Sequence, residues 1–332
     1  MQIEKLLCKD AQKNTDMIYE VRAPVLLIIF NRPDTTLRVF EEIKKVKPFK
    51  LYIAADGPRK DNFTDVKLCT QARSISEKID WVCEVKILFS DQNKGCKTGV
   101  VSAIDWFFSH EEEGIILEDD CFPATSFFYF CDEMLEKYRD DNRISTITGS
   151  NLQGGKKWGN ATYYFSNLSN IWGWATWKRF WKNYDPSLKK YEENEVSDQL
   201  KNIFPDIFLQ EAWLENFRKI KENKIDTWDY QLQLLTFFEN GLCITPNVNL
   251  ISNIGFREDA THTNNPAHNT YAANLPLQEI TKISHPVYFV PEKEADYFIL
   301  KKEFYLEDKW RKFEKDKLLR RRFKKWIRNF FK

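Results

Sequence analysis

Three carboxylates stand side by side in this chain, directly after a short apolar run. Ile115 to Leu117 lead straight into Glu118, Asp119 and Asp120. Like charges this close repel one another, and burying them is costly unless a cation or hydrogen-bond donors compensate. Mg²⁺ and Mn²⁺ prefer oxygen ligands and often bind one or two carboxylates together with substrate phosphates. The pattern therefore favours a cation at the end of a buried strand over a solvated acidic turn.

The side chains of a strand alternate between its two faces, which bears on how the three carboxylates point. If the strand extends through them, Glu118 and Asp120 share one face and Asp119 lies on the other. We expect Asp120 to line the same pocket as Asp56, which follows another apolar run.

The segments before the carboxylates alternate between apolar runs and amphipathic stretches. Apolar runs bounded by turn residues predict parallel strands, and apolar residues three or four positions apart predict helices. The predicted strands lie within residues 23–33, 49–59, 81–95 and 113–120, and helices follow at 34–46 and 96–110. In the first helix we expect Asp34 or Thr35 to be the N-cap and Leu37, Phe40, Ile43 and Val46 to face inward. Such alternation predicts an α/β fold with a doubly wound, mostly parallel sheet.

Polar residues interrupt each of these runs where the predicted strand ends. Arg32, Asp56, Lys94 and the Glu118–Asp120 cluster occupy these positions. Ligands of open α/β sheets bind outside the carboxyl ends of the strands, so the four strand ends form one candidate site. Lys94 and Lys97 flank a predicted helix start, where free backbone N–H groups could help them bind phosphate oxygens. The alternatives are a solvated lysine at each position, a salt bridge for Arg32 and a plain turn residue for Asp56.

The order of the motifs FNR, DGPR, NKGCKTGVVSAIDWFF and IILEDD resembles that of GT-A glycosyltransferases, which transfer sugars from nucleotide diphosphates. It is most similar to the N-acetylglucosaminyltransferase I type, whose acidic motif is also Glu-Asp-Asp. The resemblance covers residues 23–135 and, more loosely, 145–263.

The resemblance implies a role for each strand-end residue. Arg32 would lie along the nucleotide, and Asp56 would accept a hydrogen bond from uracil. Asp119 would contact the ribose hydroxyls, Glu118 would face the donor sugar, and Asp120 would ligate Mn²⁺ or Mg²⁺. The metal would neutralise the leaving diphosphate.

An acceptor hydroxyl also needs a base to take its proton. The resembled family carries its base in a Trp-Asp motif, and here Trp228-Asp229 precedes a predicted helix. The family has a second aspartate where this chain has Tyr230, so Asp226 is a substitute candidate. A simple helix cap is the alternative role for Asp229.

A late histidine often binds the metal or diphosphate in this family, and His262 follows the last predicted strand. The family motif is Ser-His-Gly, whereas this chain has Thr-His-Thr. An ordinary loop histidine is the alternative.

Composition indicates a folded, reduced protein. Hydrophobic residues make up 42% of the 332, and seven cysteines are scattered without a CxxC pair. Because unpaired, unpatterned cysteines are typical of reducing compartments, and neither a signal peptide nor a long apolar span is evident, we expect a cytoplasmic chain.

The C-terminal residues differ from the rest in charge. Residues 309–332 contain twelve Lys and Arg against two acidic residues, a net charge of +10, which leaves −9 for residues 1–308. Apolar residues recur every three or four positions from Leu306 to Phe330, with basic residues between them. This pattern predicts a helix lying on an anionic membrane surface through residues 306–332. Nucleic-acid binding, which we do not expect, and packing against a partner helix are the alternatives.

Three segments are expected: an N-terminal segment at 1–22, a GT-A domain at 23–292 and a basic helical tail at 293–332. The domain would have a nucleotide half at about 23–135 and an acceptor half at about 145–292. The expected activity is metal-dependent, inverting transfer from a UDP-sugar, with UDP-N-acetylglucosamine as the candidate donor, to a glycan or lipid-linked glycan at the inner face of the cell membrane. A sugar-nucleotide nucleotidyltransferase and a non-enzymatic glycan- or membrane-binding protein are the alternatives.

Overall fold

The computed structural model describes residues 20–256, 272 and 275–330 of the chain. Its first half alternates strands and helices as the sequence predicts. These elements are β1 (Val25–Ile29), α1 (Pro33–Val46), β2 (Lys50–Ala55), α2 (Phe63–Arg73), a 3-10 turn (Ser74–Lys78), β3 (Glu84–Phe89), α3 (Cys96–Phe108) and β4 (Glu113–Glu118).

The second half begins with short strands and continues with helices. Its elements are β5 (Cys121–Pro123), α4 (Thr125–Lys137), β6 (Ile144–Thr148), β7 (Tyr163–Ser166), β8 (Trp174–Trp177), α5 (Lys178–Trp181), α6 (Glu193–Ile203), α7 (Ile207–Lys221), α8 (Asp229–Phe238), β9 (Leu242–Pro246), β10 (Ile251–Asn253), α9 (Lys293–Glu303) and α10 (Leu306–Phe330).

One eight-stranded mixed sheet runs through the body in the order β3-β2-β1-β4-β8-β6-β9-β7. The four strands from β3 to β4 are mutually parallel, with Val25 of β1 opposite Leu51 of β2 and Ile115 of β4. β8 runs antiparallel between β4 and β6, and β7 runs antiparallel to β9. The fold is therefore an α/β Rossmann-like sheet, and the sequence-based prediction of its class is confirmed.

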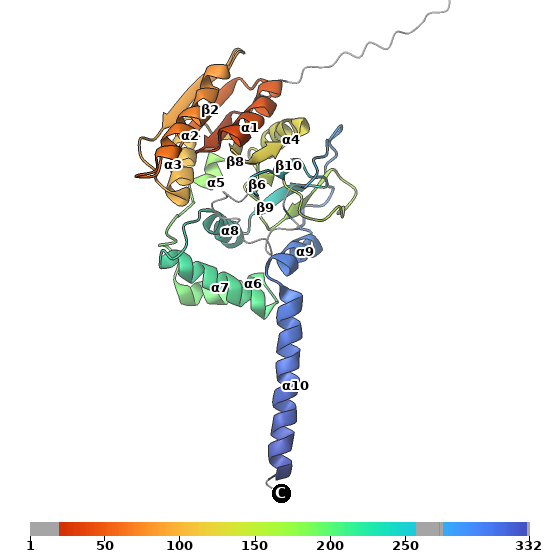
Figure 1. Ribbon diagram of the computed structural model, residues 1–332. Coiled ribbons are helices and arrows are strands. Elements are labelled where there is room, and N and C mark those ends of the chain that lie inside the picture. Colours follow the sequence, from red (N-terminus) through yellow and green to blue (C-terminus); the bar gives the residue numbers. More distant parts are fainter. Residues whose placement is uncertain (1–19, 257–271, 273–274, 331–332) are drawn as a thin grey trace, which may run out of the picture.

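Helices cover both faces of this sheet (Figure 1). The alternation of β1 shows why: Leu27 packs in the cluster that contains residues of α1 and α4, and its neighbour Leu26 packs in the cluster that contains residues of α3 and α8. Strands buried on both faces read as continuous apolar runs, which explains the near absence of polar residues between Val25 and Ile29.

The start of α1 differs from the prediction. The helix begins at Pro33 with Arg32 at the N-cap, and no side chain caps it, so neither Asp34 nor Thr35 has the expected role. Proline suits the first helical position because its fixed φ matches the helix and its missing N–H is not needed there. Leu37 is also exposed rather than inward-facing.

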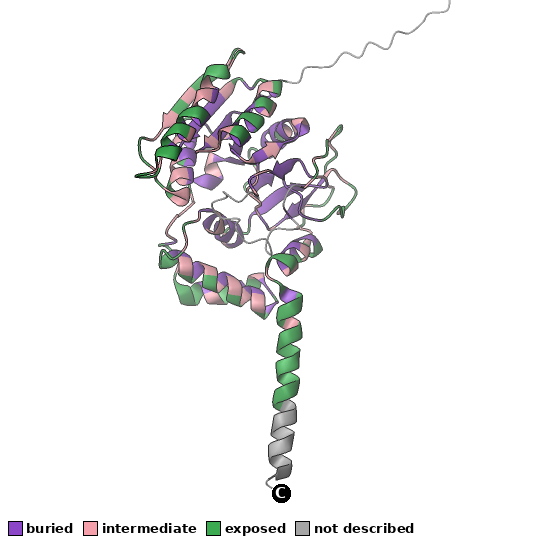
Figure 2. Ribbon diagram, viewed as in Figure 1, coloured by how far each residue is buried: buried purple, intermediate pink, exposed green. Residues whose placement is uncertain are grey.

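A second apolar cluster lies below the sheet in Figure 1 and joins α6, α7 and α9. Within the predicted C-terminal extension, α9 buries Ala295, Ile299 and Leu300 in this cluster. The helix α10 then leaves the body, and its described side chains are exposed almost from its start (Figure 2). In the part of the chain that the structure describes, no helix is both long and apolar enough to cross a membrane.

Two substitutions on α1 test which face of this helix packs against the core. Phe40 is fully buried, whereas Leu37, three residues earlier, is 37% exposed. We expect Phe40→Ala to lower the free energy of unfolding by about 3–5 kcal/mol, because it leaves a cavity in the core. Leu37→Ala, the control, should change it by no more than about 0.5 kcal/mol. Urea unfolding measures both, and equal losses would contradict the assignment of the buried face.

Candidate functional site

One cavity of about 720 Å³ opens at the carboxyl ends of β1, β2 and β4 and between the starts of α3 and α8. Seven of the eight site residues predicted from the sequence line it. They are Arg32, Asp56, Lys94, Glu118, Asp119, Asp120 and Asp229. The eighth, His262, lies outside the described residues. Asp120 and Asp56 thus share a pocket, as expected, and their roles in it stay predictions.

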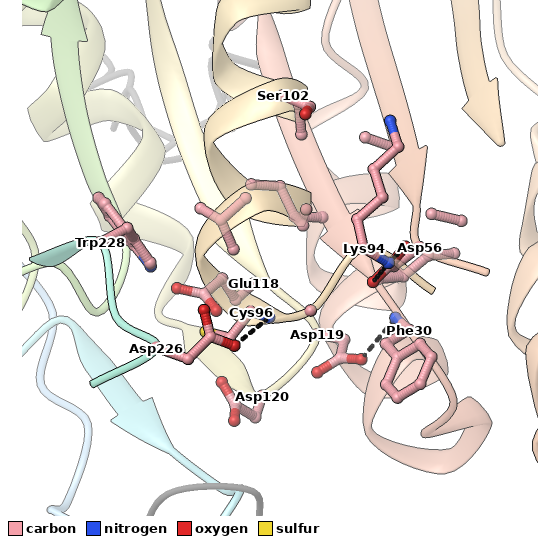
Figure 3. Close-up of a pocket in the computed structure, with 18 of the residues that line it drawn as sticks. Phe30, Asp56, Lys94, Cys96, Ser102, Glu118, Asp119, Asp120, Asp226 and Trp228 are labelled. Atoms are coloured by element: carbon pink, nitrogen blue, oxygen red, sulfur yellow. Dashed lines mark hydrogen bonds between the residues drawn. The ribbon is translucent and has the colours of Figure 1, made fainter. Parts of the chain in front are cut away.

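The carboxylate cluster does not alternate as an extended strand would. β4 ends at Glu118, and the chain turns through Asp119 and Asp120. The prediction that Asp119 lies on the opposite face is therefore wrong: all three residues line the cavity (Figure 3). Asp119 is 5% exposed and accepts a hydrogen bond from the backbone N–H of Phe30 at 3.0 Å, which ties this turn to the end of β1.

Arg32 supplies the positive charge that this cluster requires. Its Nη1 atom lies 2.6 Å from Oδ2 of Asp120 and 3.5 Å from Oδ1 of Asp119. Burial acts to lower the pKa of the guanidinium, but the charges of Asp119 and Asp120 outweigh it, so that pKa is raised. The salt bridge that the sequence left open for Arg32 is formed, with two members of the candidate site as its partners.

One guanidinium does not balance three carboxylates. Burial raises the pKa of Glu118, and the charges of Asp120 and Asp119 raise it further. Burial likewise raises the pKa of Asp119, although Arg32 opposes that effect. The end of β4 therefore opposes full ionisation of the cluster, and a second cation would favour the ionised carboxylates.

A divalent metal fits the chemistry of this site if phosphates supply part of its ligands. Within the described part of the chain no group of three His, Cys, Asp or Glu residues has the geometry to hold a metal by itself. The donors at the cavity are carboxylate oxygens, which suit Mg²⁺ or Mn²⁺ bound by one or two carboxylates together with phosphates. The Asp120 carboxylate packs directly against Gly255, and any larger residue there would displace it, since a Cβ would lie 2.2 Å from its Oδ2 atom. Asp120 would hold such an ion.

Asp56 organises the loop after β3. Its carboxylate accepts hydrogen bonds from the backbone N–H of Gly57 at 2.8 Å and of Lys94 at 2.9 Å, and from the side-chain amide of Asn93 at 2.9 Å. Burial raises the pKa of Asp56, while these N–H groups oppose that effect. Asp56 thus has the turn role that the sequence left open as an alternative. Its contact with uracil stays a prediction.

Asp226 occupies the position expected for a phosphate. Its two oxygens accept hydrogen bonds from the backbone N–H groups of Cys96 and Lys97, each at 3.2 Å, at the start of α3. The expectation of free N–H groups at this helix start is therefore wrong, because Asp226 accepts hydrogen bonds from two of them. A carboxylate is favoured there because the helix dipole is positive at its N-terminus.

Asp229 is the first residue of α8 rather than its cap. Its Oδ1 atom accepts hydrogen bonds from the backbone N–H of Tyr230 at 2.9 Å and from the hydroxyl of Thr227. Among the described residues no donor reaches its Oδ2 atom, which leaves that oxygen available to a ligand. The preceding Trp228 is buried and stacks on Trp174 with ring centroids 5.7 Å apart, which fixes the start of the helix.

A second carboxylate approaches Asp229 from the end of α9. The Glu303 side chain reaches solvent, but surrounding protein atoms and the charge of Asp229 raise its pKa to about 7. Sequence reasoning did not find Glu303, because it belongs to a helix 74 positions later in the chain.

Asp65 was also missed from the sequence, although it holds two loops of the site together. It is 1% exposed and accepts hydrogen bonds from Asn31 at 2.8 Å and from Nε and Nη2 of Arg59 at 2.6 and 2.8 Å. Asn31 precedes Arg32, and Arg59 lines the cavity. In the sequence Asp65 is an acidic residue in the first turn of a helix, which gives no sign of this bridge.

Comparisons with protein-family models and with curated proteins found no match. Among solved structures, UDP-glucose pyrophosphorylase complexed with UDP-glucose is 11% identical, with a TM-score of 0.31 over 51% of this chain and 82% of that chain. A structure of apo UDP-glucose pyrophosphorylase is 10% identical, with a TM-score of 0.33 over 67% of this chain and 90% of that chain. A 4-diphosphocytidyl-2C-methyl-D-erythritol synthase from Anaerococcus prevotii is 9% identical, with a TM-score of 0.28 over 51% and 79%. Likeness this weak decides nothing about activity.

Substituting Asp65 tests the bridge between the two loops. Arg59 lowers the pKa of Asp65 to about 2, so its charged form contributes stability above its unfolded pKa near 4, and that contribution is lost as the pH falls towards 2. We expect Asp65→Asn to lower the free energy of unfolding by about 1–3 kcal/mol at pH 7. The difference from the wild type should vanish near pH 2 in denaturant titrations. A difference that stays constant with pH would contradict the ion pair.

Proposed function

We propose that this chain is a metal-dependent, inverting glycosyltransferase that transfers a sugar from a UDP-sugar to a hydroxyl of a glycan or lipid-linked glycan. The observation that carries the proposal is the meeting of Asp56, the Glu118–Asp120 cluster and Asp229 in one cavity at the strand ends. The candidate base comes from the second half of the chain, and the candidate nucleotide residues come from the first. A donor lying across the strand ends would therefore present its sugar between the two groups.

The residues would divide the chemistry as follows. Arg32 and Lys94 would bind the nucleotide part of the donor, and Glu118 would face its sugar. The free oxygen of Asp229 would take the proton of the acceptor hydroxyl as that oxygen attacks the anomeric carbon. The bond from this carbon to the diphosphate oxygen breaks, and UDP leaves with the electron pair. A Mn²⁺ or Mg²⁺ ion held by Asp120 would neutralise the charge on the leaving group. The inverting course follows from the family resemblance.

Donor binding and sugar transfer test this proposal separately. We expect UDP-N-acetylglucosamine with Mn²⁺ to raise the melting temperature of the wild type, because a ligand that binds only the folded state stabilises it. Asp120→Asn should abolish that shift. Asp229→Asn should retain the shift and lose about 10²–10⁴-fold in transfer rate. Asp105→Asn, on the outward side of α3, is the matched control and should behave as the wild type.

The product identifies the reaction class. Release of UDP with retention of the sugar on an acceptor supports the transferase. Release of pyrophosphate from UTP and a sugar 1-phosphate would instead identify a nucleotidyltransferase. Glycan binding without either product would favour a non-enzymatic protein.

The proposed partner of α10 is an anionic membrane surface at the cytoplasmic face. Only the first part of its apolar stripe is used by the body: Leu306 is buried, and Trp310 donates a hydrogen bond from Nε1 to Asp206 at 2.8 Å. Phe208 of α7 packs against the rings of Trp310 and Phe313, at centroid distances of 4.9 and 6.0 Å. The apolar stripe of α10 therefore does not face lipid along its whole length, because its first part packs against the body.

The described side chains of α10 that follow these contacts are exposed. Leu318 and Leu319 are 52% and 51% exposed, and α10 extends away from the sheet (Figure 1). Together with the net charge of +10 over residues 309–332, this exposure supports peripheral attachment to anionic lipid.

Neutralising three exposed basic residues of α10 tests the membrane partner. Each basic residue near an anionic surface contributes about 1 kcal/mol. The triple variant Lys312→Gln, Lys315→Gln, Arg320→Gln should therefore bind phosphatidylglycerol vesicles on the order of a hundredfold more weakly in co-sedimentation. Lys60→Gln, Lys67→Gln, Lys78→Gln on the body is the matched control and should bind normally. Equal binding of the wild type to phosphatidylcholine vesicles would rule out the electrostatic attachment.

A further inference from the structure

The cation beside Asp120 in this structure is the guanidinium of Arg32. The 2.6 Å contact between Nη1 of Arg32 and Oδ2 of Asp120 is a charge-assisted hydrogen bond, and both side chains are only 18% exposed. Oδ2 is also the atom that packs against Gly255. The carboxylate expected to bind a metal is thus a carboxylate that already has a cation.

Arg32 is placed to change partners. It precedes Pro33 at the start of α1, where no side chain caps the helix. Its guanidinium lines the same cavity as Lys94 and Asp56. A diphosphate in that cavity would offer oxygens that match the planar guanidinium fork, as Asp120 does now.

We infer that Arg32 takes the place of the divalent cation at Asp120 until the donor binds, and then moves to the diphosphate while the metal takes its position. The inference rests on the proposed function for the identity of the donor. It adds the order in which Arg32 leaves Asp120 and the metal binds there. A metal arriving alone must displace a buried, hydrogen-bonded guanidinium, which opposes its binding. A metal arriving with the diphosphate does not, because the diphosphate gives Arg32 a new partner.

The physical consequence is positive coupling between the metal and the nucleotide. Each should tighten the binding of the other by the same factor, since coupling free energy is reciprocal. The protein would then hold little metal without the donor, and Asp120 would have a cation beside it both before and after donor binding. Breaking a buried ion pair by removing one partner is strongly destabilising, so the exchange, rather than the loss, of cations keeps the site folded.

Three variants separate this exchange from a structural salt bridge. Arg32→Met removes the charge at similar length and leaves Asp120 uncompensated. The double variant Arg32→Met, Asp120→Asn removes both charges. Arg139→Met removes an arginine that pairs with Glu113 at the opposite end of β4, away from the residues that line the cavity, and is the matched control.

Binding of Mn²⁺ to the full chain, measured by electron paramagnetic resonance with and without UDP, gives the main readout. For the wild type we expect UDP to tighten Mn²⁺ binding at least about tenfold, within the range typical of coupled sites. Arg32→Met should bind Mn²⁺ alone nearly as tightly as the wild type does with UDP, and UDP should add less than about threefold. Arg139→Met should keep the wild-type coupling.

Thermal unfolding provides a second readout in case Arg32→Met is unstable. Mn²⁺ alone should restore much of the lost melting temperature in Arg32→Met and should have little effect on the double variant or the wild type. The inference is overturned if Mn²⁺ binds Arg32→Met no more tightly than it binds the wild type, or if the wild type binds no Mn²⁺ even with UDP. Neither readout needs sugar transfer. A wild type that shows the coupling but transfers no sugar would overturn the proposed function and leave the exchange standing.

Discussion

The compensation of negative charge at the end of β4 is the constraint on which the site depends. Three successive carboxylates follow a strand whose last apolar residues are fully buried, and water cannot solvate all of them. The chain responds with a turn that aims all three at one cavity and with one guanidinium from the end of β1. The raised pKa values of Glu118 and Asp119 show that this compensation is incomplete. A site with this residual charge is suited to a cation that arrives with its own anion.

The surrounding architecture serves to hold the groups of this cavity in place. The parallel strands from β3 to β4 end at one edge of the sheet, so their loops meet without long connections. Bonds between loops then fix the arrangement: Phe30 to Asp119, Asn31 and Arg59 to Asp65, and Lys94 to Asp56. The second half of the chain closes the cavity with Asp226 on the start of α3 and Asp229 at the start of α8. Each half thus contributes groups to the one cavity.

The helical part beyond the sheet connects the site to the C-terminal helix. The end of α9 carries Glu303, whose charge acts on Asp229, and α10 begins three residues later. The contacts of Trp310 with Asp206 and Phe208 anchor the base of α10 to α7. A surface that binds the free part of α10 would therefore be held at a defined position relative to the cavity, which suits an acceptor attached to a membrane.

The sequence by itself determined the alternation of strands and helices, because apolar periodicity reflects burial on one or two faces. It also placed Arg32, Asp56 and Asp120 in one site, because the carboxyl ends of parallel strands must share an edge. Contacts between distant segments were beyond its reach. The N–H groups at the start of α3 are taken by Asp226, 130 positions away from Cys96, and Asp65 bridges two loops that no local pattern connects. The direction of Asp119 could not be predicted from strand alternation, because β4 ends at Glu118 and Asp119 lies in the turn that follows. Such features depend on which side chains meet in space, and only the tertiary structure decides that, since hydrogen bonds and ion pairs act between neighbours in space whatever their separation along the chain.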